Sequence, residues 1–250
     1  MKKQALLNTY INNFTMEESL DAIERLIASG EKSYVVAINV DVVIKIEESP
    51  ELKTVVDNAD IVLVDGKPLI WISKLHGAPV KEKVSGSDLV PLLCKRAAEK
   101  GYTVFIIGGK DGIAQQAKNK LEQKHSNIKI VGTYAPPLGF EKDEVELKKI
   151  NDMITDAHPD LLIVCFGCPK QEKWIYENID KYDAKVSVCA GATVDFLAGN
   201  VRRAPKWMSD HGLEWFYRFL QEPKRMFKRY FIDDLKILKL VWKYRRESRS

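Results

Sequence analysis

The sequence predicts an α/β protein with a Rossmann-like, mostly parallel sheet and helices on both of its faces. Apolar runs of strand length alternate with stretches of helical composition along most of the first 200 residues. The run that follows Pro159 is apolar throughout, as expected of a strand that is buried on both faces. It ends in a glycine turn that opens a helix, and open parallel sheets bind ligands at such turns.

The strands of this sheet are predicted by short apolar runs that polar or glycine-containing stretches separate. These runs comprise residues 33–38, 61–64, 102–107, 128–131, 161–166 and 186–190. A first helix is expected to begin at Thr15, which has the capping-box spacing to Glu18. Pro68 is compatible with the first turn of a helix that follows Asp65. The other expected helices comprise residues 50–59, 67–75, 86–100, 112–124, 141–157 and 170–178.

The length of 250 residues and the hydrophobic content of 45% fit one large domain with an appendage. We expect a catalytic domain of residues 1–205 and a helical appendage of residues 206–250, because no strand signal follows Met208. The chain starts without a signal-peptide core, and no run approaches the roughly 20 apolar residues of a spanning helix. The protein is therefore expected in the cytoplasm, with its four cysteines as thiols.

The appendage carries the positive charge of the chain, with 12 basic and 6 acidic residues from residue 206 onward. Pro223 is expected to divide it into helices at residues 215–221 and 225–244. Arg218, Arg225 and Arg229 are spaced so that they share a helix face, and guanidinium groups suit phosphate oxygens. Aromatic residues lie among these cations. A hairpin packed on the domain and a membrane interface both fit this pattern.

Two strand ends are candidates for chemistry. Asp65 directly follows a buried strand, where a carboxylate can be a general base or the cap of the next helix. Its position alone does not decide between these two roles. Gly108 and Gly109 end another strand, and their backbone N–H groups could bind phosphate oxygens. Because the Gly-x-Gly-x-x-Gly order and a ribose-binding acid are both missing, another nucleotide fits better than NAD.

No metal site and no cofactor are expected. Cys165 and Cys168 have the spacing of a redox pair, but Cys165 lies inside an apolar strand. No second pair would complete a zinc site, so these residues are interpreted as structural thiols. The sequence also lacks the Asp-x-Asp pair with which many sugar-nucleotide transferases hold a metal.

Several motifs together resemble the WecG/TagA/CpsF family of bacterial glycosyltransferases (glycosyltransferase family 26). The most specific are Pro-Lys-Gln-Glu at residues 169–172, Arg-Ala-Pro at 203–205 and Leu-Glu-Trp-Phe-Tyr-Arg at 213–218. The other resembling segments are residues 39–41, 64–66, 84–88, 108–112, 191–195 and 222–225. The resembling segments follow in order along nearly the whole chain.

This resemblance implies metal-independent, inverting transfer of a sugar from a UDP-sugar to a polyprenyl-diphosphate-linked sugar. The sugar is commonly N-acetylmannosamine or its uronic acid. The resemblance also implies that the appendage closes over the site and docks on the cytoplasmic face of the cell membrane, which makes the protein peripheral. By position, Asp65 resembles the proposed base, and Arg218 and Arg225 resemble a clamp on the diphosphate. The candidate substrate-binding residues are Asn39, Lys83, Gly108, Gly109, Phe140, Gln171, Asp195, Arg203, Arg218, Arg225 and Arg229.

Two other classes of protein share some of these features. A nucleotide-dependent oxidoreductase or epimerase would have a similar fold, but the missing ribose-binding acid argues against it. A nucleic-acid binder would use the basic appendage, but the sequence contains no known binding motif, so we expect no nucleic-acid partner. The sequence leaves open which sugars are transferred and accepted, and whether the chain forms homo-oligomers.

Overall fold

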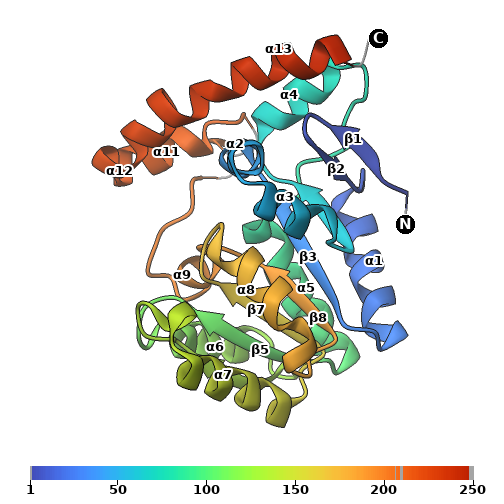
Figure 1. The fold of residues 1–250 in the computed structure, drawn as a ribbon. Helices are drawn as coiled ribbons and strands as arrows, with labels where there is room; N and C mark the ends of the chain where they lie inside the picture. Colours follow the sequence, from blue (N-terminus) through green and yellow to red (C-terminus); the bar gives the residue numbers. More distant parts are fainter. Residues whose placement is uncertain (1, 206, 209–210, 248–250) are drawn as a thin grey trace.

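The computed structural model describes residues 2–205, 207–208 and 211–247, and a parallel β-sheet lies at its centre (Figure 1). Within these residues the sheet has six strands in the order β4-β3-β8-β7-β5-β6, and all neighbouring pairs are parallel. The strands are β3 (Ser33–Ile38), β4 (Ile61–Val64), β5 (Thr103–Gly108), β6 (Lys129–Tyr134), β7 (Leu161–Cys165) and β8 (Val186–Cys189). The predicted fold class and strand positions are confirmed, and β6 continues beyond its expected end.

Helices cover both faces of the sheet and enclose two hydrophobic cores. In β7, Leu162 and Val164 belong to one core, whereas Leu161 and Ile163 belong to the other. The first core is covered by α2 (Val40–Glu48), α3 (Pro50–Asp57), α4 (Lys67–Leu75), α7 (Glu144–Ala157) and α8 (Lys170–Asn178). The second is covered by α1 (Met16–Ser29), α5 (Gly86–Lys100), α6 (Ile113–Lys124) and α9 (Thr193–Leu197). Two covered faces explain why the strands lack the alternation of a half-exposed sheet.

The predicted start of α1 and the predicted thiols are confirmed. The Oγ1 atom of Thr15 accepts a hydrogen bond from the Glu18 amide at 3.2 Å, and a Glu18 carboxylate oxygen accepts one from the Thr15 amide at 2.8 Å. The four cysteines are free. Burial raises the pKa of Cys165 to about 12, so this thiol stays protonated near neutral pH.

Among the elements that were not predicted from the sequence, two lie beside β4 and β3. The first is an N-terminal hairpin of β1 (Gln4–Leu6) and β2 (Thr9–Ile11), which is followed by contacts to the outer edge of β4. There, the Asn12 amide donates to the carbonyl of Val62 at 2.8 Å, and the Asn12 side-chain oxygen accepts from the Val62 amide at 2.8 Å. The second element is α2, which follows β3 directly. Its β-branched residues favour strands, and this preference conceals the helix in the sequence.

The C-terminal segment forms a chain of short helices that ends on the core. It contains α11 (Glu214–Gln221), α12 (Pro223–Lys228), a π-helical segment (Arg229–Asp233), a 3₁₀ segment (Asp234–Lys236) and α13 (Ile237–Glu247). The predicted break at Pro223 is confirmed because this residue begins α12. The single helix expected for residues 225–244 is wrong, because the π-helical and 3₁₀ segments interrupt it.

Helix α13 lies across α2, at the top of the view in Figure 1. Its residues Ile237 and Leu240 are buried in the hydrophobic core that α2 covers. Glu47 of α2 binds the Lys243 ammonium at 2.7 Å and the Tyr244 hydroxyl at 2.9 Å. Among the described residues, no helix is long and apolar enough to cross a membrane. The division into a domain of residues 1–205 and an appendage of residues 206–250 stays a prediction.

Candidate active site

Asp65 lies at the carboxyl edge of the sheet, at the end of β4. Its amide donates a hydrogen bond to the carbonyl of Ile38 at 2.7 Å, which fixes the backbone at the end of the neighbouring strand. The N-cap position of α4 is occupied by Gly66, and no side-chain hydrogen bond caps this helix end in the described structure. The Asp65 carboxylate is therefore not used as a helix cap, and it remains available for chemistry.

The environment of Asp65 favours its protonated form more than water does. Burial raises the pKa of Asp65 from its ordinary value of 3.8 to about 6. The charges around it come from three elements: Lys83 and Arg218 lower this pKa, whereas Glu214 and Asp88 raise it. A carboxylate with a pKa near 6 is ionised at neutral pH and is a stronger base than an exposed aspartate.

Lys83 forms the centre of the charged cluster beside Asp65. Its side chain is only 14% exposed, and its ammonium lies 3.1 Å from the Asp88 carboxylate and 3.5 Å from the Glu214 carboxylate. Burial opposes the charge of Lys83, but Asp88 and Glu214 together raise its pKa. Burial also opposes the charge of Asp88, yet hydrogen bonds from Ser85 and Arg203 lower the pKa of Asp88 to about 2. Both residues are therefore charged at neutral pH.

Arg203 and Arg218 converge on the aromatic ring of Phe196. The guanidinium carbon of Arg203 lies 6.0 Å from the ring centroid, and that of Arg218 lies 5.7 Å from it. Arg203 also binds Asp88 at 2.5 Å and donates to the carbonyl of Ser87 at 3.2 Å. Two arginines and one lysine are thus connected through Asp88 and Phe196, and guanidinium groups at such a site suit phosphate oxygens.

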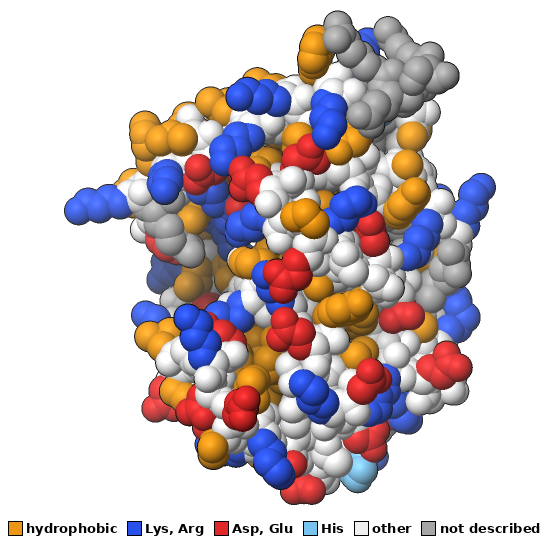
Figure 2. Space-filling model, viewed as in Figure 1, with side chains coloured by type: hydrophobic (Ala, Val, Ile, Leu, Met, Phe, Trp, Pro, Cys, Tyr) orange, Lys and Arg blue, Asp and Glu red, His pale blue; other side chains and the backbone are white. Residues whose placement is uncertain are grey.

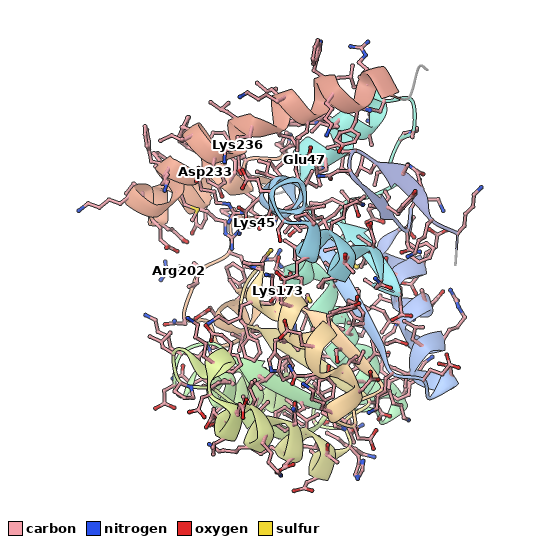
Figure 3. All side chains as sticks on the ribbon, viewed as in Figure 1. Lys45, Glu47, Lys173, Arg202, Asp233 and Lys236 are labelled. Carbon is pink, nitrogen blue, oxygen red and sulfur yellow. The ribbon has the colours of Figure 1, made fainter. Side chains whose placement is uncertain are left out.

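Arg229 begins the π-helical segment and belongs to a second charged cluster, with Asp41 and Lys45 of α2. Its guanidinium lies 3.8 Å from the Asp41 carboxylate, which also binds the Lys45 ammonium at 2.8 Å. Lys45 donates to the carbonyl of Cys168 in the turn after β7 at 3.2 Å. In Figure 3, Lys45 lies just below α2, and Arg202 lies to its left, below α11 and α12. The side chain of Arg225 is outside the part of the chain that the structure describes, so its role as a clamp stays a prediction.

The turn after β5 packs tightly against the end of β7. A Cβ atom on Gly108 would lie 2.5 Å from the carbonyl oxygen of Cys165, and Gly108 has a φ of 115°. Only glycine fits this close approach of two backbones. Gly109 follows, and its amide donates to the same carbonyl at 3.4 Å. No side-chain hydrogen bond caps the start of α6 in the described structure, which is compatible with the predicted binding of phosphate oxygens.

Gln171 connects the turns that follow β7 and β8. Its side-chain oxygen accepts hydrogen bonds from the amides of Gly167 at 3.2 Å and Gly191 at 2.9 Å. Its side-chain nitrogen donates to Glu172 at 2.8 Å, and the residue is only 5% exposed. Gln171 therefore holds two turns of the site together in this structure. Its predicted contact with a nucleotide-sugar would require these hydrogen bonds to rearrange.

Three further predicted residues lie at different depths. Asp195 is partly buried near the start of α9, and its carboxylate accepts a hydrogen bond from Asn200 at 3.2 Å. Asn39 is partly buried as well and caps α2 through a hydrogen bond from the Val42 amide at 3.2 Å. Phe140 is buried and packs 4.7 Å from the ring of Phe166. Phe140 thus belongs to the hydrophobic core, and its predicted contact with substrate stays a prediction.

Sequence reasoning gave no role to Asp88, Phe196 and Glu214, which the structure brings into the cluster. Two of them had a detectable signal. Asp88 follows the helix-capping Ser85 by three residues, and Glu214 precedes Arg218 by one helical turn. Among the described residues, no group of three His, Cys, Asp or Glu side chains could hold a metal ion.

A Rossmann-like sheet with a partly buried carboxylate among lysine and arginine side chains at its carboxyl edge indicates an α/β enzyme. Residues 4–250 match the sequence model of the glycosyl transferase WecG/TagA/CpsF family, and the chain belongs to this family of glycosyltransferases. The resemblance inferred from the motifs is confirmed.

Two curated relatives are both named N-acetylglucosaminyldiphosphoundecaprenol N-acetyl-beta-D-mannosaminyltransferase. The relative from Bacillus spizizenii is 30% identical over 216 residues, which cover 86% of this chain and 81% of the relative. The relative from Bacillus subtilis is 27% identical over 226 residues, which cover 90% of this chain and 86% of the relative.

Proposed function

We propose that this glycosyltransferase moves N-acetylmannosamine or a related hexose from a UDP-sugar to a polyprenyl-diphosphate-linked sugar, in cell-wall or surface-polysaccharide synthesis. The names of the two curated relatives describe the transfer of N-acetylmannosamine to an N-acetylglucosaminyl diphospholipid. The observation that carries the proposal is Asp65, a carboxylate with a pKa of about 6 at the carboxyl edge of the sheet. Lys83 and Arg218, two cations that suit a diphosphate, act on this carboxylate.

The proposed reaction is a single displacement at the anomeric carbon of the donor sugar. Asp65 accepts the proton of an acceptor hydroxyl as the hydroxyl oxygen forms a bond to the anomeric carbon. The bond between this carbon and the β-phosphate oxygen breaks, and UDP leaves with the electron pair. Because attack and departure occur on opposite faces, the configuration inverts. Asp65 then releases its proton to solvent, which a carboxyl group with a pKa near 6 does readily at neutral pH.

The leaving UDP develops negative charge, which must be stabilised at the moment of transfer. Lys83, Arg203 and Arg218 provide three cations within one connected cluster. Asp88 and Phe196 hold them in place before any substrate arrives, so little reorganisation is needed. This arrangement supports transfer without a metal ion.

The acceptor lipid stays in a bilayer, so the enzyme is proposed to lie on the cytoplasmic surface of the membrane. Leu235, Leu238 and Trp242 form an exposed stripe at helical spacing, opposite the face of α13 that packs on α2, and Trp242 is 61% exposed. Lys239 and Lys243 flank this stripe. Figure 2 shows hydrophobic side chains beside Lys and Arg over the region of α12 and α13. Apolar and cationic side chains on one surface suit an anionic bilayer.

A panel of UDP-sugars tests this proposal. The full-length protein is incubated with each donor and a short-chain N-acetylglucosaminyl-diphosphopolyprenol, and mass spectrometry identifies lipid products. We expect one added N-acetylhexosamine from UDP-N-acetylmannosamine and an inverted linkage by NMR. Binding is compared in parallel, and UDP should protect the protein against thermal unfolding more than NAD does. If no donor gives a lengthened lipid-linked sugar, the proposed reaction is wrong.

A further inference from the structure

The ion pair between Lys83 and Glu214 joins the core to the C-terminal segment beside the proposed base. Lys83 lies just before α5, whereas Glu214 is the first residue of α11, 131 residues later. The Lys83 ammonium lies between two carboxylates, 3.1 Å from Asp88 and 3.5 Å from Glu214. One of its partners is therefore fixed in the core, and the other is present only when α11 is docked.

Helix α11 has further contacts with the core close to this ion pair. Arg218 follows Glu214 by one helical turn and lies over the ring of Phe196. Gln221 donates a hydrogen bond to the carbonyl of Arg202 at 3.2 Å. Phe196 also contacts Arg203, which binds Asp88. Glu214 is connected to Asp88 as well, because both bind Lys83. The docked α11 therefore adds a second carboxylate beside Lys83.

Lys83 is also the cation that affects Asp65 most strongly. The charged groups that face Asp65 are Lys83 from the loop before α5, Asp88 from α5, and Glu214 and Arg218 from α11. Asp65 and the two other carboxylates attract the same ammonium. If Glu214 were absent, Lys83 would be shared between Asp65 and Asp88 alone, and a base that pairs with a lysine accepts a proton less readily.

We propose that Glu214 is a positioning residue that keeps Lys83 away from the proposed base when α11 docks on the core. The inference rests on the proposed function, because it assigns Asp65 as the base. Its consequence is that the charge of Glu214 limits how strongly Lys83 weakens the base. Glu214 holds the Lys83 ammonium at 3.5 Å, and Arg218 on the same helix lies over Phe196.

The substitution Glu214→Gln tests the proposal because it removes the charge and keeps the shape. Loss of this negative charge and release of Lys83 both lower the pKa of Asp65. We therefore expect the acid limb of the pH profile of kcat to move down by at least about 0.5 pH unit. At pH 8, kcat should fall by about 3-fold to 10-fold, since a weaker base transfers the proton less effectively. Glu214→Asp keeps the charge and should restore much of the normal profile.

A matched control removes another contact between the C-terminal segment and the core. Glu48→Gln breaks the exposed ion pair of Glu48 with Lys236, which are 2.6 Å apart. This pair lies outside the cluster around Lys83, so the control should keep the normal pH profile. If Glu48→Gln and Glu214→Gln behave alike, Glu214 serves attachment only and the proposal is wrong.

A second measurement does not depend on activity. Carboxyl carbons of aspartate are labelled with ¹³C, and Asp65 is titrated by NMR, its signal being assigned from Asp65→Asn. In Glu214→Gln the pKa of Asp65 should be lower than in the natural protein, and an unchanged pKa overturns the inference. If the natural protein transfers no sugar but this pKa still moves, the proposed function fails and the coupling between Glu214 and Lys83 stands.

Discussion

Replacing Asp65 by asparagine should stabilise the protein while it removes catalysis. Asparagine has nearly the same shape but no charge, so it avoids the cost of keeping a carboxylate partly buried. The pKa of Asp65 is about 6 in the folded protein and 3.8 ordinarily. At about 1.36 kcal/mol for each pH unit, this difference corresponds to about 3 kcal/mol at neutral pH. Hydrogen bonds that the asparagine amide cannot make reduce this gain, so we expect the free energy of unfolding to increase by roughly 1–3 kcal/mol.

The stabilisation should depend on pH with a definite sign. Between pH 3.8 and pH 6, the folded protein holds the Asp65 proton that the unfolded chain has lost, so natural stability decreases as pH rises through this window. Below pH 3.8 the carboxyl group is neutral in both states. The advantage of Asp65→Asn should therefore be largest above pH 6 and disappear below about pH 4.

Urea unfolding at pH 7.5 and pH 4 measures this difference, with the free energy of unfolding compared between natural protein and variant at each pH. Asp156→Asn removes an exposed carboxylate from α7 and serves as a control, expected to change stability by less than about 0.5 kcal/mol. Turnover of Asp65→Asn should fall by about 10²–10⁴, the usual contribution of a general base. A variant that is less stable at pH 7.5, or that keeps more than a tenth of the turnover, would refute this account of Asp65.

Three other predictions concern Arg218, the exposed stripe on α13 and the independence of transfer from a metal ion. Arg218→Ala should lower turnover on a short-chain, water-soluble acceptor by about 10²–10³, by analogy with loss of an oxyanion donor; full activity there would assign Arg218 to the membrane instead. Vesicle binding of the same variant should weaken by only about 1 kcal/mol. Replacing Leu238 and Trp242 by serine should reduce co-sedimentation with anionic vesicles and leave turnover on the soluble acceptor unchanged; equal losses in both assays would contradict a docking role. A chelator should leave activity unchanged; a loss of activity that added magnesium or manganese reverses would contradict transfer without a metal.

The sheet could be predicted from the sequence because its strands are buried on both faces. Such strands appear as short apolar runs, and their order along the chain with intervening helices leaves few alternatives to a parallel sheet. The position of Asp65 could be predicted for the same reason, since it directly follows such a run. The helix α2 could not, because its valine and isoleucine residues continue the pattern of β3.

The arrangement of side chains around Asp65 could not be predicted in the same way. The contact between Lys83 and Glu214 spans 131 residues, and neither periodicity nor motif spacing indicates pairs so distant. Gln171 illustrates a second limit. Its place in the first turn of α8 was predicted, but its side chain turns inward to connect Gly167 and Gly191. Sequence spacing locates a residue on an element without giving the direction that its side chain takes.

The pairing of Asn12 with Val62 has a consequence for the base. Asp65 directly follows β4, which is the last strand on its side of the sheet, and a last strand has a neighbour on one side only. Asn12 supplies the other neighbour, since it both donates to and accepts from the backbone of Val62. A slip of β4 by one residue would turn its side chains to the opposite face and move Asp65 away from Lys83. We therefore expect the paired Asn12 to hold β4 in register, so that the location of the proposed base depends on a buried amide that is remote in sequence and no part of the charged cluster.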